Sequence, residues 1–100
     1  MSQVRVALPV HLQTLANVGG EVCVDMVEVP TPNTVLDALE ARYPMLRGTI
    51  REHGSLKRRA FIRYFADGRD ISHESADEPL PRPVAAGSDA FCVIGAISGG

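Results

Sequence analysis

Apolar and polar residues alternate along two segments near the start of the chain. In residues 4–8 the large apolar side chains occupy every second position, which is the two-residue period of a half-buried strand. Residues 21–29 are rich in valine, but the valines change parity in mid-segment, so a bulge near Asp25 and Met26 is expected. Turn-forming residues at 17–20 separate the two segments. The pattern predicts an N-terminal β-hairpin.

Helical spacing replaces this alternation in the middle of the chain. Apolar residues recur every three or four positions over residues 35–43, and the proline that follows marks the end of this helix. Asn33 or Thr34 is expected to cap its first turn with a side-chain oxygen. A weaker pattern continues over residues 45–53. One main helix and a second, poorer helix are therefore predicted.

Three more strands are predicted in the second half of the chain. Residues 60–66 form one strand, and Asp67-Gly68 is a hairpin turn signal that leads into a short returning strand at 69–71. Residues 72–87 form a polar loop with three prolines and one irregular turn. Residues 89–97 are nearly all apolar, as expected of a strand in the centre of a sheet.

This order of elements predicts the fold. A helix laid over one face of a sheet buries the apolar side of both, and the long connection through the helix lets the last strand pair in parallel beside the first. The arrangement is the β-grasp, an α+β fold with a mixed four- to five-stranded sheet packed on one main helix. At 100 residues the chain is expected to be one domain, 1–100, with a flexible C-terminal Gly-Gly tail.

Composition excludes several classes of protein. A hydrophobic content of 45% with a net charge of −2 argues against disorder. There is no apolar run long enough for a membrane span and no secretion signal at the start, so a cytoplasmic protein without membrane contact is expected. Cys23 and Cys92 lie in strand-like runs and are expected to pack as small hydrophobic residues in a reducing compartment.

Charge and possible metal ligands point to no nucleic-acid or metal site. Lys57-Arg58-Arg59 lacks interleaved stacking aromatics and lies in a net acidic chain, so it is predicted to be a solvated face or a docking patch for an acidic partner. The three histidines share no spacing, and no metal is expected. Ser72-His73-Glu74 resembles a catalytic triad only in composition, because sequence neighbours rarely converge on one point. The histidines are His11, His53 and His73.

Strand alternation also predicts which face of the sheet stays open. In the third strand Arg63 cannot be buried unpaired, so its side is expected to face solvent together with Phe61 and Phe65. By the same alternation Cys92 and Ile94 of the last strand lie on the open side, next to Ala7 and Arg5 of the first. An apolar patch with a polar rim is typical of a partner site. The predicted partner-binding residues are Phe61, Arg63, Phe65, Cys92 and Ile94.

The sequence ends in Ser98-Gly99-Gly100 directly after the last predicted strand. Two glycines make a thin tail that can thread a narrow tunnel, and they leave the carboxylate of Gly100 unhindered. Small residues are also common at frayed chain ends. The β-grasp pattern favours a functional tail.

With this tail, the sequence resembles the ThiS/MoaD family of ubiquitin-like sulfur carriers, and its MoaD-like branch most closely. The resemblance covers nearly the whole chain. The segments that carry it are Val4-Arg5-Val6, Leu12-Gln13-Thr14-Leu15, residues 34–39 with Tyr43-Pro44, residues 61–70, Asp77-Glu78-Pro79-Leu80 and residues 87–100.

The resemblance implies a protein that carries sulfur and has no catalysis of its own, at most the small subunit of a sulfur-transferring synthase. A ubiquitin-activating-type adenylyltransferase would adenylate the carboxylate of Gly100, using its own ATP and Mg²⁺. Sulfur would then replace AMP to give a thiocarboxylate, and a sulfur-acceptor synthase would pass it to a small molecule. A JAMM-type peptidase would trim residues that extend beyond Gly100. The expected pathway is biosynthesis of the molybdenum cofactor (molybdopterin), a related cofactor, cysteine or a natural product.

Two alternatives stay open at this point. The chain is alternatively a ubiquitin-like modifier conjugated to lysines through Gly100, or an interaction module in which the diglycine is incidental. No constellation of residues supports a stand-alone enzyme. The sequence does not identify the final sulfur acceptor.

Overall fold

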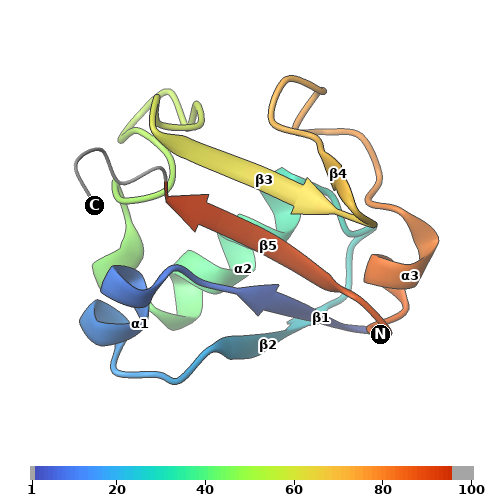
Figure 1. The fold of residues 1–100 in the computed structure, drawn as a ribbon, viewed down its shortest axis with the longest axis horizontal. Helices are drawn as coiled ribbons and strands as arrows, with labels where there is room; N and C mark the ends of the chain where they lie inside the picture. Colours follow the sequence, from blue (N-terminus) through green and yellow to red (C-terminus); the bar gives the residue numbers. More distant parts are fainter. Residues whose placement is uncertain (1, 96–100) are drawn as a thin grey trace.

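The computed structural model describes residues 2–95 of the chain and contains a single sheet with helices packed against it (Figure 1). Residues 1 and 96–100 lie outside this description. The elements in chain order are β1 (Ser2–Ala7), α1 (Val10–Ala16), β2 (Glu21–Met26), α2 (Pro32–Arg42), the 3₁₀ turn η1 (Pro44–Leu46), β3 (Ile62–Ala66), β4 (Arg69–Asp70), α3 (Arg82–Ala85) and β5 (Ala90–Gly95).

The five strands form one mixed sheet in the order β2-β1-β5-β3-β4. β1 pairs antiparallel with β2 and parallel with β5, while β5 pairs antiparallel with β3. The last strand is therefore central, as its apolar sequence predicted. The predicted α+β β-grasp fold is confirmed, including the parallel contact between the first and last strands.

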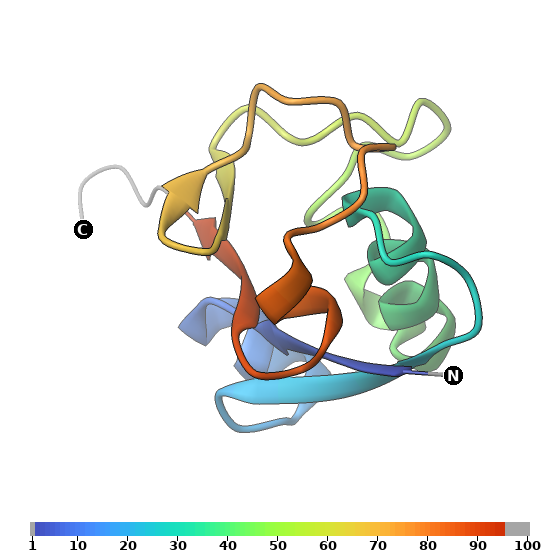
Figure 2. The same ribbon diagram turned by 90° about the vertical axis from the view of Figure 1, so that its right-hand side faces the viewer.

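One face of this sheet packs on α2 and forms the core (Figure 2). Alternate residues of the central strands point into it, among them Val4, Val6, Phe91 and Val93. From α2, Leu36 and Leu39 meet them and are fully buried. Such burial of apolar side chains is the main driving force for the fold.

The connection between β1 and β2 contains a helix that the sequence did not predict. α1 begins after Pro9 and ends at Asn17, whose left-handed backbone (φ 57°) closes the last turn. Only Leu12 and Ala16 of this helix are buried, one turn apart. Two apolar contacts in seven residues give too weak a periodicity to be recognised, so the turn signals at 17–20 were taken for the whole connection.

The second strand is shorter than predicted and has no bulge. Its register with β1 runs without interruption from Glu21 to Met26. Val27 and Val29 follow the strand and are exposed by 84% and 64%. The change of parity that suggested a bulge is therefore the end of the strand.

The main helix starts two or three residues earlier than predicted. Thr31, rather than Asn33 or Thr34, is the N-cap, and its hydroxyl accepts a hydrogen bond from the Thr34 backbone at 3.0 Å. The Thr34 hydroxyl in turn accepts one from the Thr31 backbone at 2.8 Å, which completes a capping box. Pro32 occupies the first turn, where its missing N–H costs nothing.

The second helix predicted at 45–53 is wrong beyond its first turn. Only η1 is helical, and Gly48 then takes a left-handed conformation (φ 79°). The ring of His53 occupies the space where a β-carbon of residue 48 would be. The left-handed backbone favours glycine here, and His53 lies in a turn and not at a helix end.

The hairpin between β3 and β4 and the following loop agree with prediction. Asp67 and Gly68 both have positive φ, 53° and 74°, which is the geometry of a type I′ turn. β4 comprises Arg69–Asp70, and the irregular turn expected within 72–87 is the short helix α3.

The prediction for Cys23 is wrong, because its side chain is exposed on the outer side of β2. Cys92 is partly buried. None of the helices within residues 2–95 is long and apolar enough to cross a membrane.

Candidate functional site

The face of the sheet opposite α2 carries the residues expected to bind a partner. Phe65 of β3 lies opposite Cys92 of β5, and Cys92 lies beside Ala7 of β1. Arg63 and Ile94 form the next cross-strand pair. We call the set Arg5, Ala7, Arg63, Phe65, Cys92 and Ile94 the open face.

Exposure within single strands confirms the predicted sides of the sheet. Ile94 is 44% exposed while its neighbour Val93 is only 2% exposed. In β3, Tyr64 is 4% exposed and packs on Phe91 with ring centroids 5.4 Å apart, whereas Arg63 and Phe65 are half-buried on the other side. The open face thus extends over β1, β5 and β3, with an apolar strip of Ala7, Phe65, Cys92 and Ile94 in its middle. Its role in binding is a prediction.

Ion pairs frame this strip on both sides. The Arg5 Nε donates to Glu21 at 2.9 Å, and this hydrogen bond lowers the pKa of Glu21 below its ordinary value. On the opposite side Arg63 lies 3.8 Å from Asp70. Hydrogen bonds from Ser72 lower the pKa of Asp70. The frame is a polar rim of the kind that surrounds protein interfaces.

Cys92 lies in the centre of the strip. Burial raises the pKa of its thiol, with Asp89 and Glu21 acting in the same direction. A thiol with a raised pKa is a poor nucleophile at neutral pH. Cys92 therefore contributes apolar contact surface to the open face.

Phe61 lies in the turn before β3, next to the end of the open face. It precedes β3, is 69% exposed, and borders a surface hollow of about 350 Å³ where β5 ends. His11 packs over Gly95 at this point, because a β-carbon on Gly95 would lie 3.1 Å from its ring. The hollow is lined by His11, Thr49, Glu52, Arg59, Ala60, Phe61, Ile62 and Gly95.

The predicted reactive residue, Gly100, lies outside the described residues, as do Ser98 and Gly99. The description ends at Gly95, which pairs with Ile62 at the end of β5. The segment that leads to Gly100 thus starts at the hollow beside Phe61, next to Ile94 of the open face.

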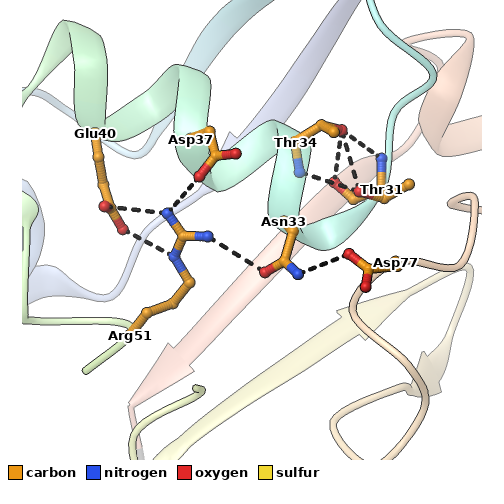
Figure 3. A network of polar contacts seen from close by, with 7 residues as sticks. All are labelled: Thr31, Asn33, Thr34, Asp37, Glu40, Arg51 and Asp77. Carbon is orange, nitrogen blue, oxygen red and sulfur yellow. Dashed lines mark hydrogen bonds and ion pairs between the residues drawn. The ribbon is translucent and has the colours of Figure 1, made fainter. Parts of the chain in front are cut away.

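A buried polar network that the sequence analysis missed lies on the α2 side (Figure 3). The guanidinium of Arg51 is 2% exposed and pairs with Glu40 at 3.1 Å and Asp37 at 2.9 Å. It also donates to Asn33 at 3.2 Å, and Asn33 donates to Asp77 of the loop after β4. Burial works against the charge of Arg51, but the hydrogen bonds that it donates to Glu40 and Asp37 outweigh this effect and raise its pKa.

This network joins three segments that are distant in sequence. It ties α2 to the connection before β3 through Arg51, and to the loop at 72–81 through Asp77. Asp37 and Glu40, three residues apart on one face of α2, were a signal that could have suggested a buried cation. Figure 3 shows the side chains of α2 bonded to Arg51 on one side and to Asp77 on the other, so the network ties these two connections to the helix.

The basic segment is less available than its sequence suggested. Arg58 donates to the backbone carbonyls of Ser72 and Ile62, and Arg59 to that of Gly48. Both arginines therefore hold loops together, although Lys57 and Arg59 are exposed. Within residues 2–95 no three His, Cys, Asp or Glu side chains lie together as a metal site would require.

Comparisons with known proteins identify solved structures of the same fold. No protein-family model and no curated protein matches the sequence. The small archaeal modifier protein SAMP1 of Haloferax volcanii has a TM-score of 0.76 at 22% identity, with 99% of this chain and all of that chain covered. SAMP1 of Methanosarcina acetivorans has a TM-score of 0.73 at 26% identity, covering 100% of this chain and 98% of its own.

A third similar structure is that of the BexX/CysO complex of Amycolatopsis orientalis. Its matching chain has a TM-score of 0.74 at 20% identity, with 97% of this chain and 99% of that chain covered. All three matches span essentially the whole described domain. They confirm the resemblance to small ubiquitin-like proteins that the sequence indicated.

Proposed function

We propose that this protein is a sulfur carrier whose Gly100 carboxylate is adenylated and converted to a thiocarboxylate. The observation that carries the proposal is the course of β5. This central strand presents Ile94 on the open face, ends at Gly95, and leads within five residues to Gly100. A partner that binds the open face would have the diglycine end within reach of its active site.

The chemistry needs activation because a carboxylate is a poor acyl donor. An oxygen of the Gly100 carboxylate attacks the α-phosphate of ATP and pyrophosphate leaves. Hydrosulfide then attacks the acyl carbon, AMP leaves with the electron pair of the C–O bond, and the product is the thiocarboxylate. A persulfide donor forms an acyl disulfide in the same way, and a thiol must then reduce its S–S bond to release the thiocarboxylate. ATP and Mg²⁺ belong to the adenylyltransferase, since this sequence has no glycine-rich phosphate-binding loop.

In this proposal the partner binds the exposed part of the sheet. Phe65, Cys92 and Ile94 supply apolar contact area and Arg63 a charge at the rim. Phe61 borders the hollow from which the tail departs and contacts the partner there. The partners are the adenylyltransferase and then a sulfur-acceptor synthase of small-molecule biosynthesis, molybdopterin-type or related. CysO, which has the same fold, forms a complex with BexX.

The test is chemical conversion of the chain end. The full chain is incubated with Mg-ATP, sulfide and the ubiquitin-activating-type adenylyltransferase of the same organism. Replacement of one oxygen by sulfur raises the intact mass by about sixteen units, the mark of the covalent thiocarboxylate. Deletion of Gly100 withdraws the carboxylate by about 3.3 Å, one extended residue, and abolishes the gain because attack needs near-contact distance.

Two results would overturn the proposal. One is a full-length chain, with its end at Gly100 verified by mass, that never gains sulfur. The other is a chain without Gly100 that gains it as fast as the full chain. Unfolding curves of both proteins serve as the control, because residue 100 lies beyond the last strand.

A second candidate function is favoured by the names of two similar structures, which are those of small archaeal modifier proteins. In that function the activated Gly100 forms isopeptide bonds with lysines of other proteins, and a JAMM-type peptidase reverses them. A blot of a cell lysate distinguishes the two functions. A ladder of conjugates indicates a modifier, and a single band with a thiocarboxylate indicates a carrier.

A further inference from the structure

The two edges of the sheet differ in how well they can pair with another strand. β4, at one edge, is only two residues long, which is too short to hold an added strand. β2, at the other edge, is six residues long, contains no proline and pairs with β1 in one uninterrupted register (Figure 1). Among residues 2–95 no strand pairs with its outer side. We call this outer side of β2 the β2 edge.

The hydrogen bonds to β1 show which backbone groups of β2 point outward. The N–H of Leu8 donates to the carbonyl of Gly20 at 3.2 Å, so these two residues form a hydrogen-bonded pair of the antiparallel ladder. Such pairs alternate with pairs that make no hydrogen bond, so Val22 and Val24 bond to β1 and the residues between them do not. The outward backbone groups belong to Glu21, Cys23 and Asp25.

A groove of about 420 Å³ lies between the β2 edge and α2. Ala38 and Ala41, three residues apart on α2, line it with side chains of a single methyl group. Arg42 also lines it and donates to the outward carbonyl of Cys23 at 2.8 Å. A strand added to the edge directs every second side chain toward the helix. The groove gives apolar side chains room to lie on the two alanines.

The other side of an added strand meets an acidic surface. Residues 21–40 contain five acidic residues and no basic one. Glu21 and Asp25 of β2 and Glu28 just beyond it are all exposed. Arg5 pairs with Glu21, but no cation of residues 2–95 lies within ion-pair distance of the other two acids. Basic side chains are therefore the complement of this side.

This acidity argues against a second copy of the chain as the added strand. Two β2 strands can pair symmetrically about any residue from 21 to 26. A centre at Cys23 places Glu21 opposite Asp25 of the other copy, and a centre at Asp25 places that acid opposite itself. In the remaining registers an acid lies opposite or diagonal to an acid. Like charges at these positions destabilise strand pairs.

We propose that the β2 edge binds an extended peptide of a partner protein in which apolar and basic residues alternate. The peptide adds a sixth strand to the sheet, with its apolar side chains over Ala38 and Ala41 and its basic side chains beside Asp25 and Glu28. Its backbone replaces the guanidinium of Arg42, which is exposed and passes into water. This inference uses neither the open face nor the proposed activation of Gly100.

The experiment titrates the isotope-labelled full chain with a short capped peptide in which valine and lysine alternate, followed by NMR. We expect amide hydrogen exchange of Glu21, Cys23 and Asp25 to become slower in the complex, because their N–H groups point outward and gain partners. The amides of Val22 and Val24 should change little, since they already bond to β1. A peptide of alternating valine and glutamate is the control for charge and should not bind.

Cys23→Pro tests the backbone contact, because it removes an outward N–H without removing a hydrogen bond to β1. Binding of the valine–lysine peptide should fall about tenfold or more. Cys23→Ala keeps the N–H and is the matched control, with binding as in the wild type. Ala41→Trp fills the groove from an exposed position of α2 and should weaken binding as well, which decides the question if the proline variant does not fold.

The other outcomes overturn the inference. Equal binding of the two peptides would remove the role of the acids, and unchanged binding in both Cys23→Pro and Ala41→Trp would remove the β2 edge as the site. Slower exchange or shifts confined to β3 and β5 would place the peptide on the open face. A dimer of the chain that Cys23→Pro dissociates would make a second copy the occupant.

Discussion

Arginine–carboxylate pairs occur on both sides of this protein, in opposite surroundings. Arg51 on the α2 side is 2% exposed and bonds to Asp37, Glu40 and Asn33. Arg5, at the edge of the open face, is 36% exposed in its side chain and pairs with one carboxylate, that of Glu21. The residue type is the same, but one pair is part of the interior and the other lies in water.

The difference shows how the domain divides its tasks. A buried charge is costly unless all its hydrogen bonds are met, so the Arg51 network fixes three segments in one arrangement. A surface pair in high dielectric contributes little to folding. The α2 side therefore holds the structure, and the open face can be changed without unfolding it. Four predictions test this division, starting with the largest effect.

Two neighbouring residues of β5 give the sharpest test. Val93→Asp places a carboxylate in the core, where Val93 is 2% exposed, and is expected to destabilise the fold by more than about 4 kcal/mol. Ile94→Asp, one residue on and 44% exposed, is expected to leave the unfolding curve nearly unchanged. It should weaken binding to the adenylyltransferase about tenfold or more, because the new charge is buried in the interface.

Circular dichroism in urea and a binding titration measure the two effects. Phe65→Asp serves as a second open-face variant and should behave as Ile94→Asp does. An Ile94→Asp protein that unfolds would show that the open face is part of the folded interior. One that folds and binds normally would remove this face from the proposed interface.

Arg51→Ala is expected to have the next largest effect on the free energy of unfolding. It leaves the carboxylate of Glu40, whose side chain is 9% exposed, without its partner, and such losses cost about 3–5 kcal/mol. Arg51→Lys keeps the charge but not the planar fork that bonds to three groups, and should lie between the wild type and the alanine variant. Urea denaturation measures both. Equal stability of all three proteins would show that the network does not hold the loops.

The buried position of Arg51 could not be predicted from the sequence, whereas the two sides of the sheet could. Alternation in β3 and β5 predicted the open and buried sides correctly, since that period is local and each strand shows it by itself. The contact between Arg51 and Glu40 joins residues eleven apart through a turn that depends on Gly48. No local pattern in the sequence distinguishes Arg51 from the other eight arginines as the buried one.

Short and edge elements of the fold were also predicted wrongly. α1 has too few buried positions for a visible period, and Cys23 was assigned to the interior from the apolar character of its strand although it lies on the outer side. The edge position of β2 and the direction of alternate residues decide its exposure. Those features emerge only once the strands are paired. The residues at the chain end lie outside the described part of the structure, so their role stays a prediction.

Tyr64 gives the third prediction, on the buried side of β3. Burial raises the pKa of Tyr64 to about 12 from an ordinary value of 10.0. The folded state thus holds the phenol proton more tightly, and this stability is complete below pH 10 and lost as the pH rises toward 12. The free energy of unfolding falls by roughly 2–3 kcal/mol, because the pKa of Tyr64 differs by about two between the folded and unfolded states. Tyr64→Phe should remove this part of the alkaline decline, measured by urea denaturation between pH 9 and about 12.

The control for Tyr64 is the open face itself. Phe65→Tyr introduces a half-buried phenol on the neighbouring residue, and the alkaline decline should stay as in the wild type because solvent accommodates the phenolate. A decline that is the same in the wild type and in Tyr64→Phe would mean that the phenol of Tyr64 ionises as easily in the folded protein as in the unfolded chain.

The smallest effect is expected for Arg5→Ala. Its pair with Glu21 lies at the surface, and the guanidinium also donates to the carbonyl of Gly87 at 3.2 Å. Water replaces both partners when the side chain is removed, so the melting temperature should shift by no more than the scatter of replicate melts.

The sign of any pH dependence of this shift in melting temperature follows from Glu21, whose pKa Arg5 lowers. That contribution is present above the ordinary pKa of a glutamate and disappears as the pH falls through the lowered value, so wild type and variant should converge in acid. Melts at neutral and acidic pH, with Arg51→Ala beside them, check this. A loss for Arg5→Ala as large as that for Arg51→Ala would mean that exposure does not decide which arginine stabilises this fold, and the division between the two sides would fail.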